Sequence, residues 1–269
     1  MVDEHRIALW VQYDGAEFNG WQLQKGTSSR SVQSALEQAL SFVADEAIRV
    51  HCAGRTDTGV HATAQMVHFE TTRHRPMQGW IRGANANLQT AVSVYSGCTV
   101  DASFHARFSA LSRSYRYLIY NAGTRPALGA DYLCWVRQPL DAVKMHAQAQ
   151  ALLGELDFSS FRAASCQSST PMRRVDAIEV SRRGPVIVID ITANAFLHHM
   201  VRNIAGALIA VGRGDRAEGW LAELLAARDR TLAPDTAMAG GLYLVGVQYP
   251  QQYDLPPPEP GPWFAPLPA

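Results

Sequence analysis

Asp57 is the residue whose type and surroundings most directly suggest chemistry. It lies in the stretch GRTDTGVH, residues 54–61, directly after an apolar, strand-like run. The glycines on either side allow the backbone to turn sharply or a ligand to approach closely. If the stretch is extended, Arg55 and Asp57 project to the same side, and an ion pair between them would keep the carboxylate ionised. Such a carboxylate can act as a nucleophile, although on spacing alone a structural turn aspartate is the commoner explanation.

A second candidate is the stretch SRSYRYLIYN, residues 112–121. Strand alternation places Tyr115 and Tyr117 on one face and Arg116 on the other, with Arg113 near the start. Aromatic rings interleaved with arginine suit a sheet that stacks bases and binds phosphates. Tyrosine also favours strands for packing reasons, so this stretch alone indicates little.

The stretch FLHHMVRN, residues 196–203, is the third candidate. A helix from His198 to Val211 would put His198 and Arg202 on one face, with Arg202 directed toward a cleft. On such a helix His198 and His199 point about 100° apart. No cysteine or acid stands at ligand spacing from them, so we expect no metal site.

Charge is distributed unevenly, although the formal net charge is zero. Of the 24 basic residues 22 are arginine, and they outnumber acids around the first two stretches. This pattern indicates either a basic face for a polyanion or a general preference for arginine with ordinary solvated charges. Arginine suits phosphate because its planar group can bind two oxygens.

Several classes of protein find no support in the sequence. The four cysteines are scattered and predict reduced thiols, not disulfides or zinc sites. Glycine-rich nucleotide-binding motifs and the GxSxG motif do not occur. The apolar runs are too short to span a bilayer and the first residues do not resemble a signal peptide, so we expect a cytoplasmic protein.

The elements that must position these residues alternate between strands and helices. We expect strands at residues 7–13, 48–52, 65–70, 91–100, 113–120, 175–182, 185–193 and 241–249, and helices at 31–44, 76–87, 141–152, 198–211 and 218–227. This order predicts an α+β protein of two similar α/β halves, with mostly antiparallel sheets joined across a central basic cleft and helices on the outer face. The expected domains are 1–108, carrying Asp57, and 109–250. A proline-rich arm at 251–269 follows, with Trp263 and Phe264 as possible anchors; a disordered tail is the alternative.

Taken together and in order, the stretches YDGAEFNGWQ, SVQSALEQAL, AGRTDTGVHA, FHARFSA, SRSYRYLIYN, FLHHMVRN and GLYLVGVQYP closely resemble the TruA family of tRNA pseudouridine synthases. The resemblance extends from about Ile7 to Asp254. It implies an isomerase that converts uridine to pseudouridine at positions 38, 39 and 40 of the tRNA anticodon stem-loop. It also implies base flipping, no cofactor, no metal and a homodimer.

The resemblance assigns roles residue by residue. Asp57 matches the essential aspartate, Tyr115 the active-site tyrosine and Arg202 the active-site arginine. Arg55 matches the conserved arginine of the motif, and Leu244 the apolar residue under the flipped base. We expect Arg113 and Arg116 to contact substrate as well. Whether Asp57 attacks the ribose C1′ or the uracil C6 stays open, and Tyr115 as the base for the C5 proton is the least secure role because a tyrosine of ordinary pKa is a poor base at neutral pH.

One departure from the family lies at the site, and three competing functions are considered. Thr58 stands where the family usually has alanine. It should be tolerated if its side chain points away from the cleft, whereas a side chain facing Asp57 would add a hydrogen bond and slow the nucleophile. A non-catalytic RNA-binding module or an RNA chaperone would keep the arginines but would not need Asp57. A hydrolase has less support, because Asp57 has no second acid at glycosidase spacing.

Overall fold

The computed structural model describes residues 5–22, 30–262 and 264, which form two compact units. The first unit comprises residues 1–111 and 243–269, and the second comprises residues 112–242. The sequence-based boundary at 108/109 falls close to the end of the first segment. The strand near residue 245, expected in the C-terminal half, belongs to the first unit. The domain boundaries and the basic cleft stay predictions, and the two units are described in turn.

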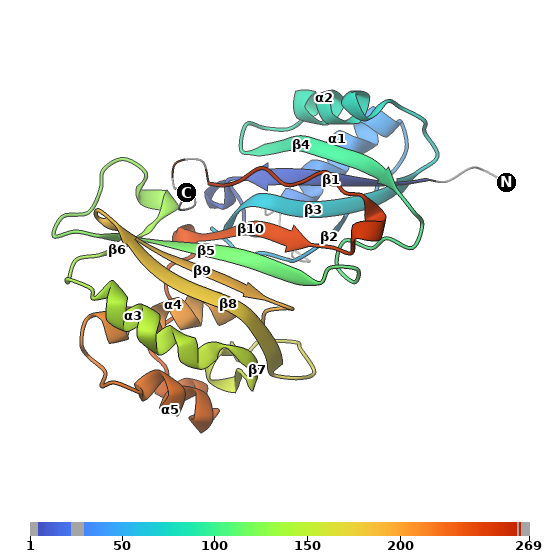
Figure 1. Ribbon diagram of the computed structural model, residues 1–269. Helices are drawn as coiled ribbons and strands as arrows, with labels where there is room; N and C mark the ends of the chain where they lie inside the picture. Colours follow the sequence, from blue (N-terminus) through green and yellow to red (C-terminus); the bar gives the residue numbers. More distant parts are fainter. Residues whose placement is uncertain (1–4, 23–29, 263, 265–269) are drawn as a thin grey trace. The chain divides into compact units, whose positions relative to one another are not determined.

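The first unit is an antiparallel sheet covered by two helices (Figure 1). Its elements are β1 (His5–Tyr13), α1 (Val32–Ala44), β2 (His51–Cys52), β3 (His61–Thr71), α2 (Met77–Asn87), β4 (Val92–Val100) and β10 (Leu242–Gln248). The strand order is β4-β1-β3-β10, with β2 also paired to β3. Only the contact of β10 with β3 is parallel within this unit. The α+β class expected from the sequence is confirmed.

The helix α1 begins where its sequence predicts. Ser31 accepts the backbone N–H of Ser34, and the Ser34 side chain bonds back to the Ser31 N–H, which forms a capping box. Leu36 and Leu40 recur at helical spacing and are fully buried. The amphipathic pattern therefore fixes both the start of α1 and the face that it packs against the unit.

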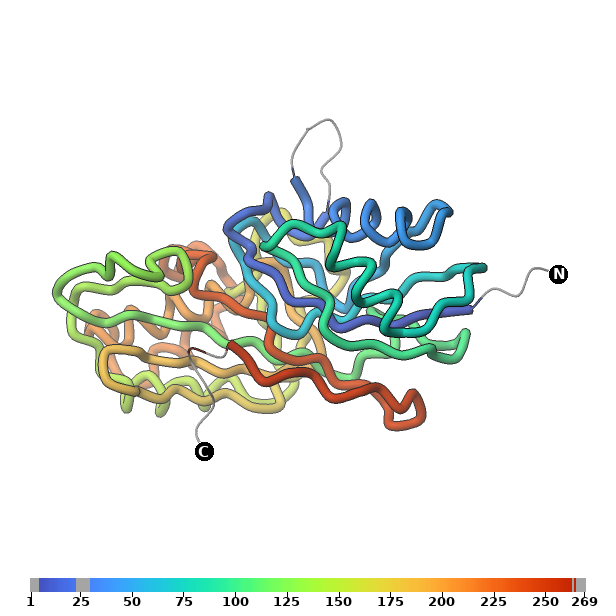
Figure 2. The backbone as a smooth tube through the Cα atoms, turned by 90° about the horizontal axis from the view of Figure 1, so that it is seen from above, coloured from blue at the N-terminus to red at the C-terminus, as the bar shows by residue number. Residues whose placement is uncertain are grey.

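The C-terminal arm packs on the first unit. After β10 the chain turns back and runs along the same unit, as Figure 2 shows. Leu9 of β1 lies on the side of α2, since a side chain at Gly97 would meet both Leu9 and Met77. Trp10 points to the opposite face, where its indole N–H donates to the carbonyl of Pro256 at 2.7 Å. Trp263, expected as an anchor, lies outside the described residues, while Phe264 meets the ring of Tyr243 edge-on.

The second unit repeats this design with three helices. Its elements are β5 (Ser112–Asn121), β6 (Cys134–Val136), α3 (Ala142–Ala149), β7 (Gly154–Asp157), β8 (Met172–Arg183), β9 (Val186–Ala193), α4 (Met200–Gly212) and α5 (Trp220–Ala227). The order is β5-β9-β8-β7, antiparallel throughout, with β6 added parallel to β5. The expected hairpin of β8 and β9 turns at Gly184, whose φ is +56°. Among the described residues no helix is both long and apolar enough to cross a bilayer.

Candidate active site

Asp57 lies on a tight loop that connects β2 to β3 in the first unit. The loop turns because Val60 N–H bonds to the Asp57 carbonyl at 3.1 Å and Gly59 adopts a φ of +77°. Two glycines from the segment after β1 pack directly on it. A Cβ at Gly15 would lie 2.0 Å from the Val60 oxygen, and one at Gly20 would lie 3.0 Å from the Thr56 oxygen. The backbone that carries Asp57 is therefore held by close contacts that only glycine permits.

Buried side chains hold the same loop from below. Gln65 of β3, which is 0% exposed, donates to the Gly54 carbonyl at 2.7 Å and accepts the Gly54 N–H at 3.3 Å. The Tyr13 hydroxyl lies 2.8 Å from the Thr56 hydroxyl and accepts a bond from the Gln65 amide at 3.3 Å. Buried polar groups are costly to leave unpaired, so this network stabilises a single loop conformation. The motif containing Tyr13 was noted from the sequence, but nothing in the spacing marks Gln65 as its partner.

His61 links the loop to β10. Its Nδ1 accepts the Gly15 N–H at 3.0 Å, and its ring stacks on Tyr243 with centroids 4.8 Å apart. Tyr243 and Leu244 pair with His61 and Ala62 across the two strands. The structure thus places Leu244 in the same unit as Asp57, on a strand that pairs with the residues just after the Asp57 loop. Leu244 is 0% exposed.

The expected pairing of Arg55 with Asp57 is not found. Within the described residues no ion pair joins these two side chains, and the turn of the loop lies just after Asp57, at Thr58 and Gly59. Arg55 is exposed and Asp57 is half-buried. Thr58, at the turn, is also exposed. The ion pair was expected only for an extended stretch, so the role of Arg55 at the site stays a prediction.

In the second unit, Arg202 is a partly exposed residue on the otherwise buried helix α4. Every residue of α4 except Arg202 is buried. A cation in the first turn of a helix is unfavourable, because the positive end of the helix dipole lies there. The Arg202 Nε nevertheless donates to the Ala237 carbonyl at 2.8 Å, which fixes the guanidinium. Helix end and guanidinium together create a positive field that suits an anion.

The predicted start of this helix was wrong. The helix begins at Met200, and His199 precedes it with a φ of +62°. His198 is held in the preceding loop, where its carbonyl accepts the Ala163 N–H and its ring nitrogen lies 3.0 Å from the Ser165 hydroxyl. The two histidines are therefore not separated by a helical turn angle, and His198 does not share a helix face with Arg202.

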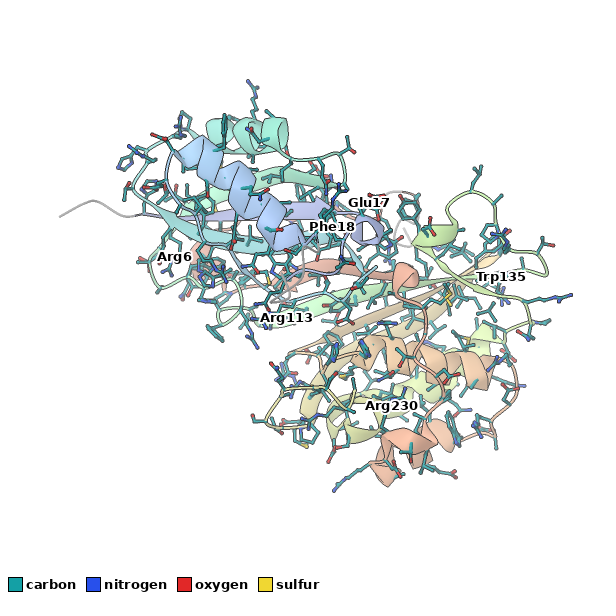
Figure 3. The ribbon with its side chains drawn as sticks, turned by 180° about the vertical axis from the view of Figure 1, so that it is seen from behind. Arg6, Glu17, Phe18, Arg113, Trp135 and Arg230 are labelled. Atoms are coloured by element: carbon teal, nitrogen blue, oxygen red, sulfur yellow. The ribbon has the colours of Figure 1, made fainter. Side chains whose placement is uncertain are left out.

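Tyr115, Arg116 and Arg113 occupy neighbouring positions on β5. Tyr115 is 8% exposed, and its ring meets Phe196 edge-on at 5.0 Å. Arg116 is 1% exposed and donates two bonds to the Asp190 carboxylate on β9, at 2.8 and 3.1 Å. Arg113, labelled in Figure 3, is half-buried, and it donates to the Asn194 carbonyl at 2.9 Å. The ion pair supplies a structural reason for Arg116, whose expected contact with substrate stays a prediction.

A buried amide beneath Arg202 was missed at the sequence level. Asn203 donates to the Phe161 carbonyl and accepts from Arg230 at 3.1 Å and from Thr236 at 2.7 Å. Arg230, labelled in Figure 3, thereby ties the segment before Ala237 to α4. The Ala237 carbonyl accepts the Arg202 bond, so this network orients the Arg202 guanidinium indirectly, by fixing the segment that contains Ala237. An asparagine beside an arginine in an apolar helix was the only signal available.

Comparison with known proteins identifies the class to which this fold and these residues belong. The model of a family described as tRNA pseudouridine synthase matches residues 9–109 and 148–250. The chain belongs to the tRNA pseudouridine synthase family.

Within that family the chain is similar to curated proteins named tRNA pseudouridine synthase A. Those of Salmonella newport and Salmonella dublin are each 57% identical over 260 residues, which cover 97% of this chain and 96% of the relative. A crystal structure of a Cbf5–Nop10–Gar1 complex overlays with a TM-score of 0.39 at 8% identity, over 89% of this chain and 58% of that chain. A score this low does not establish a shared fold.

Proposed function

We propose that the protein isomerises uridine to pseudouridine at positions 38, 39 and 40 of the tRNA anticodon stem-loop. The observation that carries this proposal is the 57% identity to proteins named tRNA pseudouridine synthase A over 97% of the chain. The tightly held loop at Asp57 supports it, since a nucleophile must be fixed against its target.

In this reaction Asp57 is the nucleophile. The target nucleotide is first turned out of its stack, at a cost of a few kcal/mol. Asp57 attacks either the ribose C1′ or the uracil C6, and the N-glycosidic bond breaks. The uracil then rotates and its C5 forms the new bond to C1′. Asp57 is released, C5 loses its proton, and N1, which no longer bonds to the ribose, takes up a proton. No atom is gained or lost overall, and the family resemblance implies that no cofactor or metal takes part.

The remaining roles follow from family resemblance. Arg202 stabilises the Asp57 carboxylate, and its positive surroundings at the start of α4 suit that task. Tyr115 contacts the uracil and serves as the base for the C5 proton, while Leu244 supports the apolar face of the base. Arg55 contacts the RNA, and we expect the same of Arg113 and Arg116, to which the resemblance assigns no role.

Release of tritium from tRNA labelled at uracil C5 tests this function, with wild type compared against Asp57→Ala. We expect release by wild type and none by the variant, while both bind tRNA. If wild type binds tRNA but releases no label, the protein is an RNA-binding module or chaperone instead. If Tyr115→Phe keeps full turnover, the tyrosine is not the base.

The finer biological setting is also part of the proposal. The tRNA substrate implies action in the cytoplasm. Family resemblance implies a homodimer of the 29.5 kDa chain. Analytical ultracentrifugation checks this, and a species of monomer mass at micromolar concentration would refute the dimer.

A further inference from the structure

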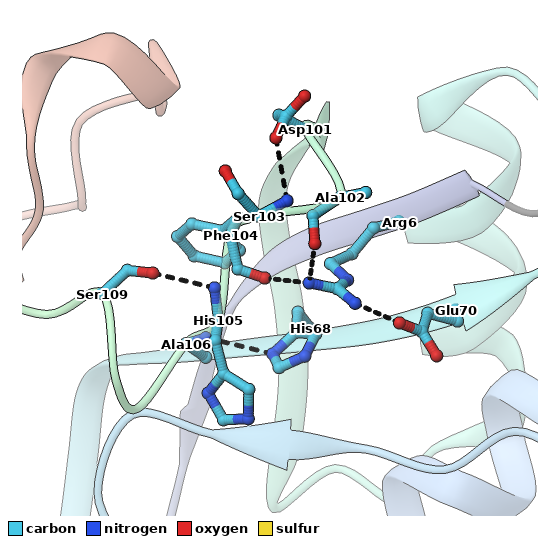
Figure 4. Close-up of polar contacts among 10 residues, drawn as sticks. All are labelled: Arg6, His68, Glu70, Asp101, Ala102, Ser103, Phe104, His105, Ala106 and Ser109. Carbon is cyan, nitrogen blue, oxygen red and sulfur yellow. Dashed lines mark hydrogen bonds and ion pairs between the residues drawn. The ribbon is translucent and has the colours of Figure 1, made fainter.

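The segment after β4 presents an exposed aromatic ring on a rigid loop. Phe108 of the FHARFSA stretch is 75% exposed. The loop from Asp101 to Leu111 that carries it is nevertheless tightly held, as Figure 4 shows. A rigid loop that displays an apolar ring to solvent is typical of a binding element.

Arg6 of β1 anchors the loop at its start. Its guanidinium donates to the carbonyls of Ala102 and Phe104 and pairs with Glu70 of β3 (Figure 4). Phe104 is 0% exposed and packs against the rings of Tyr249 and Tyr253. The loop backbone is therefore tied to the sheet at its first residues.

Further bonds fix the middle of the loop. The Ala106 N–H donates to His68 Nδ1 at 3.1 Å, and the Ala106 carbonyl accepts the Tyr249 hydroxyl at 2.6 Å. The His105 N–H donates to the Ser109 hydroxyl at 2.9 Å. The N–H and the carbonyl of Ala106, the residue before Arg107, are thus both hydrogen-bonded to side chains of the first unit.

The neighbours of Phe108 are rings and cations. His105 lies 4.3 Å from its ring at 36°, and the Arg107 guanidinium lies 5.6 Å from the ring centre. His51, exposed at the start of β2, lies 5.4 Å from His105. One exposed phenylalanine would need no explanation, but an aromatic row with a cation over it matches a base and its phosphate.

This row leads toward the Asp57 loop. His51 begins β2, the strand that runs into that loop. Burial raises the pKa of the Cys52 thiol to about 12, and the guanidinium groups of Arg55 and Arg107 both act against that rise. Both guanidinium groups therefore lie within electrostatic range of the thiol of Cys52, the residue that follows His51.

We propose that Phe108, with His105 and Arg107, forms a stacking surface for one unpaired base of the tRNA anticodon loop. A base within a stem has both faces covered, so an exposed ring selects an unpaired one. This inference rests on the proposed function, because it takes tRNA as the partner. It adds a contact that holds the RNA and takes no part in bond making.

Binding of a fluorescent anticodon-arm hairpin, followed by anisotropy, tests this surface in the full-length protein. Phe108→Ala should weaken binding about tenfold, and Phe108→Trp should restore it. Phe42→Ala is the matched control, because Phe42 on α1 is also 75% exposed. Equal affinities of the Phe108→Ala and Phe42→Ala proteins would overturn the proposal.

Hairpins with an abasic site at each loop position identify the base. One abasic site should weaken binding by wild type about tenfold and have no further effect on Phe108→Ala. If every abasic hairpin affects both proteins equally, no loop base stacks on Phe108. Arg107→Gln should also reduce the slope of log affinity against log salt by about one.

Two other outcomes are read separately. If Phe108→Ala changes the sedimentation mass but not RNA affinity, the surface joins copies of this chain and the proposal fails. Binding requires no turnover, so failure of tritium release by wild type would refute the isomerase function without altering the binding result. Loss of the stacking effect with tritium release intact would refute only this inference.

Discussion

A histidine in the first unit is built to remain neutral. His68 is 2% exposed, and its Nδ1 accepts the Ala106 N–H, which leaves the ring proton on Nε2. Burial lowers its pKa to about 3, helped by the nearby positive or ionisable groups of His105, His51 and Arg6. A charge there would be buried and would break the bond that fixes the loop.

This neutral histidine predicts acid sensitivity. An unfolded histidine titrates near 6.5, so below that pH the unfolded chain takes up a proton that folded His68 refuses, and stability is lost as pH falls toward about 3. From pH 7 to pH 5 the loss should be about 2 kcal/mol. Urea unfolding at both pH values measures it, and His68→Asn, which keeps an acceptor for Ala106, should lose correspondingly less.

Glu46 titrates at lower pH than an unfolded histidine, so it contributes little to the change in stability between pH 7 and pH 5. Bonds from the Thr71 and Thr72 side chains lower the pKa of Glu46 to about 2. Because this pKa is depressed, the stability from Glu46 is present above about 4.5 and is lost only below that pH. An unchanged slope between pH 7 and pH 5 in His68→Asn would contradict the assignment of that slope to His68.

Among the structural elements, the Asp57 loop shows how a reactive position can be fixed by residues that take no part in the reaction. Tyr13→Phe removes only the hydroxyl that bonds Thr56, the residue before Asp57, and that accepts a bond from Gln65; the ring stays in place. We expect the single-turnover rate at saturating tRNA to fall about tenfold, because small displacements of a reacting group are costly. Affinity for tRNA should not change.

A control variant with a similar loss of stability, in the second unit, distinguishes positioning of Asp57 from general destabilisation of the protein. Ser160 of the second unit is a fully buried hydroxyl that donates to the Leu224 carbonyl and accepts the Asp229 N–H. Ser160→Ala should lower the melting temperature by a similar amount, since each change removes about 1 kcal/mol of bonding. If both variants lose rate equally, Tyr13 does not position Asp57.

Periodicity and capping predicted most elements, and the failures have local causes. Residues 48–52 were expected to be a strand, but only His51 and Cys52 pair with β3. The N–H groups of Ile48 and Val50 bond instead to the side chains of Ser41 and Glu37 on α1. A strand pattern specifies side-chain alternation, and it does not reveal that a distant helix supplies the backbone partners.

Some residues of the candidate site could be predicted from the sequence, and others could not. Asp57 and Arg202 could be singled out from the sequence, since each is a charge set in an apolar or glycine-bounded stretch. The positions of Gln65 and Asn203 could not, because their roles depend on partners 11 and 42 residues away along the chain. The left-handed conformation of His199 could not be predicted either. It depends on distant residues, because hydrogen bonds to Ala163 and Cys166 hold His198 outside the helix.

At the scale of the whole molecule, the first unit is assembled from both ends of the chain. Residues 1–111 form most of its sheet, and residues 243–269 add β10 and the arm. The arm covers the face of β1 that carries Trp10, which is 1% exposed. The unit that holds Asp57 is therefore completed by the C-terminal residues of the chain.

This dependence predicts the effect of removing the arm. A chain ending at Asp254 would expose Trp10, and burial of about 100 Å² of such a side chain contributes about 2 kcal/mol. Hydrogen exchange measured by mass spectrometry should show faster exchange in β1 and β4, while β8 and β9 of the second unit serve as the internal control. Trp10→Phe, which loses the bond to Pro256, should produce a smaller change in the same strands. Equal exchange of β1 in the shortened and full-length chains would mean that the sheet is stable without its arm, and that the proline-rich segment serves another purpose.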